Sequence, residues 1–91
     1  MRSEAAFDAE RAWRLNPQVA LRDEAFGALA YHYGNRRLVF LKSRPLVELV
    51  SSLERYPSAS AALVALAPAG QRASYERALA RLAASEVIDA R

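Results

Sequence analysis

The spacing of apolar residues changes part-way along the chain. Between Val19 and Lys42, apolar residues alternate with polar or small ones, which is the two-residue period of β-strands. The pattern predicts strands at residues 19–22, 26–33 and 38–42. Gly27, inside the second of these strands, indicates a bulge or a close approach of another backbone segment.

A hairpin is predicted between the second and third strands, because Gly34 and Asn35 both tolerate positive φ. With Asn35 and Arg36 as the two turn residues, Tyr33 lies opposite Leu38 across the hairpin. This register gathers the large apolar side chains on one face, which we expect to be the core side: Leu29, Tyr31, Tyr33, Leu38 and Phe40.

After Ser43 the apolar spacing becomes that of a helix. The first helix is predicted from Pro45 to near Arg55, since proline suits a first helical turn. A second, short helix follows with Ser58 as its N-cap, and a third covers about 71–85. Strands followed by helices indicate an α+β domain, in which three helices pack on one face of a three-stranded antiparallel meander.

The N-terminal residues lack an apolar anchor before Trp13. We expect residues 1–12 to form a flexible tail ahead of a single domain at 13–91. Trp13 itself is expected to pack onto the domain, because an isolated Trp is costly to leave in water. Residues 1–16 carry three acidic side chains and no apolar core, so no secretory signal is expected.

The residue inventory offers little to catalysis. The chain has no cysteine and one histidine, His32, on the face opposite the expected core side. A lone histidine in a strand is most often a surface or packing residue, and it makes no metal site by itself. No serine or glycine pattern matches a nucleophile elbow or a phosphate-binding loop. We therefore expect no enzyme activity and no cofactor, and the lack of cysteine fits a reducing cytoplasm.

Positive charge gathers at both ends of the third predicted strand. Arg36 and Arg37 precede it, Lys42 ends it and Arg44 follows, and no acidic residue lies among them. Such a cluster attracts an anionic partner: a nucleic acid, an acidic peptide or a membrane surface. Of these we expect an acidic peptide, with nucleic acid disfavoured and no membrane partner.

The third strand is unusually apolar for the edge of a sheet. Leu38, Val39, Phe40 and Leu41 are consecutive, whereas edge strands are usually protected by charge or proline. One explanation is that the strand is central, or that the segment around Trp13 covers it. The other is β-augmentation, in which an extended peptide adds as a further strand.

The third helix would form a second wall beside this edge. Arg77 and Arg81 lie four residues apart, either as a solvated basic face or as groups that flank a cleft and pair with acidic ligand residues. The predicted peptide-binding residues are therefore Arg37, Leu38, Val39, Phe40, Leu41, Lys42, Tyr75, Arg77, Ala78, Arg81 and Leu82.

Two runs of sequence carry a resemblance to a known family. These are WRLNPQVALR from Trp13 and, most specifically, FGALAYHYGNRRLVFLK from Phe26 to Lys42. They closely resemble the peptide chaperones of mycofactocin biosynthesis, which are similar to the pyrroloquinoline-quinone peptide chaperones and are RiPP recognition elements. The resemblance covers about residues 10–90, and beyond residue 58 only the pattern matches.

The resemblance implies a winged-helix-like fold and a chaperone that performs no chemistry itself. It implies that the leader of a ribosomally made precursor peptide docks on the strand Leu38–Lys42, beside the third helix. It also implies a radical SAM maturase as partner, which acts on the Val-Tyr end of the peptide.

Two alternatives stay open on the residues alone. A winged-helix DNA-binding regulator is compatible with the basic composition and with arginines 72, 77 and 81 on the last helix, although the charge excess lies at the hairpin. The apolar edge could also pair with itself in a homodimer.

Overall fold

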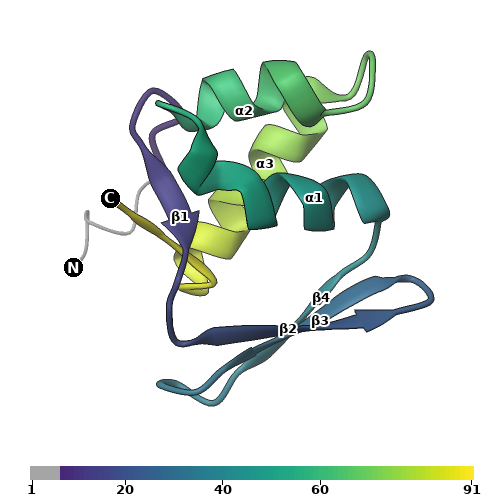
Figure 1. Ribbon diagram of the computed structural model, residues 1–91, viewed down its shortest axis with the longest axis vertical. Coiled ribbons are helices and arrows are strands. Elements are labelled where there is room, and N and C mark those ends of the chain that lie inside the picture. Colours follow the sequence, from purple (N-terminus) through teal and green to yellow (C-terminus); the bar gives the residue numbers. More distant parts are fainter. Residues whose placement is uncertain (1–6) are drawn as a thin grey trace.

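Two small sheets and a layer of helices make up the computed structural model, which describes residues 7–91. β2, β3 and β4 form a three-stranded antiparallel sheet in that order, and β1 pairs with β5 separately. Figure 1 shows the three-stranded sheet lying along one side of the helical layer. The elements are β1 (Trp13–Leu15), β2 (Val19–Glu24), β3 (Gly27–His32), β4 (Leu38–Leu41), α1 (Arg44–Ser52), the 3-10 helix η2 (Leu53–Arg55), α2 (Ala59–Leu66), α3 (Arg72–Ala84) and β5 (Ile88–Ala90). The predicted α+β class, with three antiparallel strands followed by three helices, is confirmed.

The helices begin where their capping residues stand. The Ser43 hydroxyl accepts a hydrogen bond from the Leu46 N–H at 3.2 Å, and Pro45 lies in the first turn of α1. The Ser58 hydroxyl accepts one from the Ala61 N–H at 3.1 Å and so caps α2, as predicted. Each cap satisfies a backbone donor that has no partner within its helix.

The predicted core face of the sheet is wrong. Ala28, Ala30 and Leu41 are buried, whereas Leu38 and Phe40 are 59% and 57% exposed. α1 packs against β3, and alanines on the inner face let its backbone come close to the strand. The large apolar side chains of β3, Leu29 and Tyr31, therefore lie on the outer face, turned away from the helices.

The predicted hairpin register is also wrong, by two residues. Tyr31 lies opposite Leu38 and Leu29 lies opposite Phe40, so the connection spans residues 33–37. His32, which is only 3% exposed and belongs to the inner face, determines this longer loop. Its Nδ1 accepts hydrogen bonds from the backbone N–H groups of residues 34 and 35 at 3.0 and 3.1 Å. The positive φ of the loop falls on Arg36, at 65°.

A second sheet joins the two ends of the described chain. Trp13 lies opposite Ala90, and Leu15 lies opposite Ile88. The sequence does not reveal these strands, because each has three residues and they come from opposite ends of the chain. Trp13 is buried as predicted, and its indole N–H donates to the Asp8 carbonyl at 2.8 Å.

Residues 7–12 lie against the domain. The Phe7 ring is 5.0 Å from that of Trp13, between centroids. The carbonyls of Arg11 and Ala9 accept hydrogen bonds from the first two N–H groups of α2, at 3.0 and 2.8 Å. The rest of the predicted tail, residues 1–6, lies outside the described residues.

Gly27 marks a close approach of backbone, as the sequence predicts. Its φ is +148°, and a Cβ at this position would collide with the carbonyl oxygen of Leu41. Only glycine therefore allows β3 to begin its pairing with the end of β4.

We predict that Gly27→Ala lowers the free energy of unfolding by about 3 kcal/mol or more, because it combines a backbone conformation reserved for glycine with a backbone collision. Urea unfolding followed by circular dichroism measures this loss. Gly70→Ala is the matched control, since Gly70 has φ +78° and open space around it. It should cost only about 1 kcal/mol, the penalty of a left-handed conformation alone. Equal losses in the two variants would contradict the prediction.

Candidate functional site

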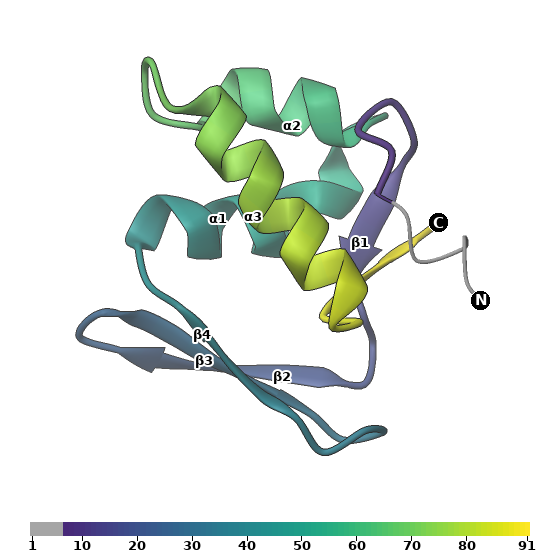
Figure 2. The same cartoon turned by 180° about the vertical axis from the view of Figure 1, so that it is seen from behind.

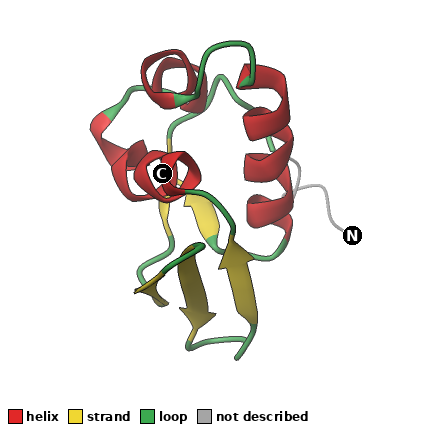
Figure 3. Ribbon diagram, turned by 90° about the vertical axis from the view of Figure 1, so that its right-hand side faces the viewer, coloured by secondary structure: helices red, strands yellow, loops and turns green. Residues whose placement is uncertain are grey.

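β4 is an open edge of the three-stranded sheet. Within residues 7–91 it pairs with β3 and with no other strand. The segment around Trp13 pairs with β5 and does not cover β4, so the described structure excludes one explanation for the apolar strand. Figure 3 shows β4, the strand that leads up into α1, on the same side of the domain as α3.

The register determines which backbone groups of β4 face outward. The His32 N–H donates to the Arg37 carbonyl at 2.9 Å, and the His32 carbonyl accepts from the Arg36 N–H at 2.7 Å, so His32 directs its backbone groups toward the β4 side. Hydrogen-bonded and non-bonded pairs alternate along an antiparallel ladder. Val39 and Leu41 therefore bond to β3, whereas Leu38 and Phe40 turn their N–H and C=O groups toward the open edge.

The side chains of the same strand divide in the same way. Leu41 is buried and Val39 is half-buried beneath the helices, while Leu38 and Phe40 lie exposed on the outer face. An added strand would thus meet free backbone groups along the edge. It would meet apolar side chains on the outer face.

α3 stands beside the beginning of α1, close to the end of β4. The Tyr75 hydroxyl lies 2.9 Å from the Ser43 hydroxyl, within hydrogen-bond distance. In Figure 2, α3 lies in front of the other helices and β4 lies in front of the sheet, so both face the same side of the domain. Ser43 therefore has two roles, as the cap of α1 and as the contact of α3, and the sequence indicated neither.

The predicted residues of α3 separate into buried and exposed positions. Ala78 and Leu82 are buried and belong to the packing of the domain. Arg81 is exposed and continues the i, i+3 row that begins at Tyr75. Arg77 is also exposed, and it borders a hollow whose other wall includes Phe7.

The charges at the two ends of β4 are unequally paired. Arg44 lies 3.4 Å from a carboxylate oxygen of Asp23. Arg37 and Lys42 are exposed and have no salt bridge within residues 7–91. Arg36, beside Arg37, is likewise exposed, so cations without a salt bridge in this part of the chain flank both ends of the open edge.

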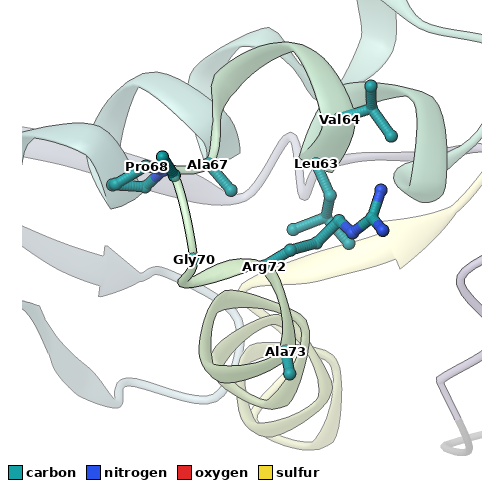
Figure 4. Close-up of a pocket in the computed structure, with 8 residues that line it drawn as sticks. Leu63, Val64, Ala67, Pro68, Gly70, Arg72 and Ala73 are labelled. Carbon is teal, nitrogen blue, oxygen red and sulfur yellow. The ribbon is translucent and has the colours of Figure 1, made fainter.

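A second hollow lies between the end of α2 and the start of α3, with a volume of about 450 Å³. Figure 4 shows Arg72 extending alongside Leu63 at its rim. The hollow belongs to the helical layer, and no residue of β4 lines it.

Charged side chains of the described residues meet in pairs rather than in larger clusters. Within residues 7–91 no group of three or more His, Asp or Glu side chains could hold a metal ion. His32 is buried and its Nδ1 is occupied by the hairpin. None of the helices in this part of the chain has the length and apolar character needed to span a bilayer.

Comparison with known proteins decides the family. The peptide chaperone MftB family matches residues 12–89. The chain belongs to this family. The peptide chaperone MftB of Mycolicibacterium smegmatis is 49% identical over 83 residues, covering 90% of this chain and 81% of the relative. That of Mycobacterium ulcerans is 46% identical over 84 residues, covering 91% and 77%.

A third relative, the peptide chaperone MftB of Mycobacterium tuberculosis, is 57% identical over 51 residues, which are 56% of this chain and 47% of the relative. No solved structure matches the chain. Family membership confirms the resemblance seen in the sequence, and it makes the chain a peptide chaperone of mycofactocin biosynthesis rather than an enzyme.

We predict that the Tyr75–Ser43 contact holds α3 against the end of β4. Tyr75→Phe removes one hydroxyl and should lower the free energy of unfolding by about 0.5–1.5 kcal/mol. Ser43→Ala removes the same contact and also the cap of α1, so its loss should be larger by about 1 kcal/mol. In a double-mutant cycle measured by urea unfolding, the double variant should lose less free energy of unfolding than the sum of the two single losses. Strict additivity would show that the two hydroxyls do not interact.

Proposed function

We propose that this chain binds the leader of a ribosomally made precursor peptide by adding it as a strand to Leu38–Lys42, and presents it to a radical SAM maturase. The observation that carries the proposal is the open edge, where Leu38 and Phe40 turn their backbone groups away from β3. In strand addition the main chain supplies affinity, and alternate side chains supply specificity.

The charge around the edge favours an acidic leader. Arg37 and Lys42 lie at opposite ends of β4. Acidic residues near the two ends of a bound strand would meet one cation each. Antiparallel pairing of two copies of β4 would bring these cations together, and like charges on adjacent strands are destabilising. The same charges thus disfavour a homodimer through this edge.

α3 supplies the second wall of the proposed site. Tyr75 lies next to the end of β4 through its contact with Ser43, and Arg81 is exposed further along the same row. Leader side chains on the inner side of the added strand would lie between half-buried Val39 and this wall. Arg81 would add a further cation to those at the ends of the strand.

Presentation to an enzyme agrees with membership of a chaperone family. The family is one of peptide chaperones, and the described residues hold no cluster of three or more His, Asp or Glu side chains that could bind a metal ion. A peptide held by its leader keeps its other end free for modification, and the local concentration of that end near a docked enzyme rises.

We predict that Phe40→Pro weakens leader binding at least tenfold, because it removes an outward backbone donor. Proline is tolerated on an edge strand when its missing N–H faces away from the sheet, so the variant should fold. Phe40→Ala is the matched control, since it removes the side chain and keeps the donor. Isothermal titration with the leader peptide measures both, and equal affinities for the two variants would contradict strand addition.

Val39→Pro distinguishes the two sides of β4. The Val39 N–H bonds to β3, so this substitution should lower the free energy of unfolding by about 3 kcal/mol, whereas Phe40→Pro should cost much less. Urea unfolding of the two variants measures the difference. Greater destabilisation by Phe40→Pro would mean that the assignment of inward and outward groups is reversed.

Salt dependence separates this function from DNA binding. Leader affinity should fall by less than about tenfold between 50 and 200 mM salt, because backbone pairing and apolar contacts carry much of it. A protein that neutralises many phosphates loses about 10³–10⁵ over this range. Fluorescence anisotropy with labelled leader and labelled duplex DNA tests this, and tighter, steeply salt-dependent binding of DNA would favour a regulator.

A further inference from the structure

The outer face of the sheet carries an exposed apolar surface that peptide addition at β4 does not itself require. Its large side chains come from all parts of the β3–β4 hairpin and from the β2–β3 turn. Four of them are 45–62% exposed: Phe26, Tyr33, Leu38 and Phe40. Together with half-buried Leu29 and Tyr31, these four residues make up the apolar part of the outer face.

This surface is contiguous. The rings of Phe26 and Phe40 are 5.6 Å apart between centroids, and those of Tyr31 and Tyr33 are 4.9 Å apart. Leu29 lies opposite Phe40, and Tyr31 lies opposite Leu38. These two cross-strand pairs are neighbours on one face of the hairpin, and they lie between the two aromatic pairs. An antiparallel sheet covered by helices on one side normally presents polar side chains on the other. An exposed apolar surface of this kind marks an interaction site.

The outer face is also hollowed. A depression of about 490 Å³ lies between β2 and the hairpin, and it is lined by Ala20, Leu21, Arg22, Leu29, Tyr31, Tyr33 and Leu38. Interfaces commonly centre on a side chain of one partner that fills a pocket of the other, with Tyr and Arg enriched in the walls. The depression is therefore suited to receive an anchoring side chain of a protein.

Basic side chains border this apolar surface. Arg22 lies on the same side of the sheet and is paired with Glu24 at 2.9 Å. Lys42, two residues beyond Phe40, continues the outer row of β4 and has no salt bridge within the described residues. The border therefore has a net positive charge. A partner with an apolar centre and an acidic rim would complement it.

We propose that the outer face docks the peptide-modifying enzyme, through an apolar enzyme surface with an acidic rim, and that the bound leader strand extends the docking surface. The proposal rests on the function proposed above. Side chains of an added strand alternate between faces, so every second leader residue would lie on the outer face beside Leu38 and Phe40. The enzyme would then bind the loaded chaperone more tightly than the empty one.

A second copy of the chain fits this face less well. In a twofold dimer the same patch meets itself, so the net positive border of one copy would face that of the other. An enzyme with an acidic rim gains from the same charges. Self-association is therefore a competing outcome of the test and not the proposal.

The proposal predicts reciprocal coupling. If the leader raises the affinity of the enzyme by a given factor, the enzyme must raise the affinity of the leader by the same factor. Substitutions of outer-face residues far from the edge should weaken binding of the enzyme. They should leave binding of the leader alone unchanged. Tyr33 is such a residue, because it lies beyond the end of β3, outside β4, and is 62% exposed.

The experiment measures binding of the full chain to immobilised radical SAM maturase, with and without saturating leader peptide, by surface plasmon resonance. The variants are Tyr33→Ser and Tyr31→Ser. Val64→Ser is the matched control, since Val64 is 66% exposed but lies on α2, in the helical layer. Expected results are a loss of at least tenfold in enzyme affinity for the tyrosine variants, no change for Val64→Ser, and leader affinity within twofold of the parent chain in all three.

The outcomes separate this inference from the function on which it rests. Unchanged enzyme binding in both tyrosine variants, with normal leader binding, would overturn the outer-face proposal and leave strand addition standing. Failure of the parent chain to bind the leader would instead overturn the proposed function. A dimer of the parent chain in sedimentation analysis, lost in Tyr33→Ser, would assign the face to a second copy and also overturn the proposal. Circular dichroism confirms that each variant is folded.

Discussion

The packing of α1 on the small side chains of β3 decides the character of the whole sheet. Ala28 and Ala30 leave room for the helix, so their face becomes the core. Because side chains alternate along a strand, the large residues between them must lie on the other face. The register with β4 then places Leu38 and Phe40 on the same outer side. Gly27 allows the strands to meet closely where this pairing ends.

This arrangement couples two properties of β4 that are usually considered separately. In an antiparallel strand the position of a residue determines both the face of its side chain and the direction of its backbone groups. Leu38 and Phe40 therefore present exposed side chains on the outer face and free backbone groups at the edge. A peptide could use the backbone of these residues while an enzyme uses their side chains, so the two partners need not compete.

The sequence predicts the helices well and the orientation of the sheet poorly, for different reasons. Ser58 and Pro45 are local signals, and local signals position helix starts. Both faces of the β3–β4 hairpin are apolar, so hydrophobicity cannot distinguish them, and larger side chains are wrongly assigned to the core. What decides the face is the close packing of α1, which depends on contacts between distant segments. The pairing of β1 with β5 has the same long-range origin.

His32 shows why the hairpin and the basic cluster have to be considered together. Its buried ring accepts two backbone N–H groups of the loop, and this loop carries Arg36 and Arg37. A two-residue turn would have placed Tyr33 opposite Leu38 and shifted the whole β4 register by two residues. The wider loop instead keeps both arginines exposed next to the start of β4. The lone histidine thus has a structural role: it shapes the loop that precedes the open edge.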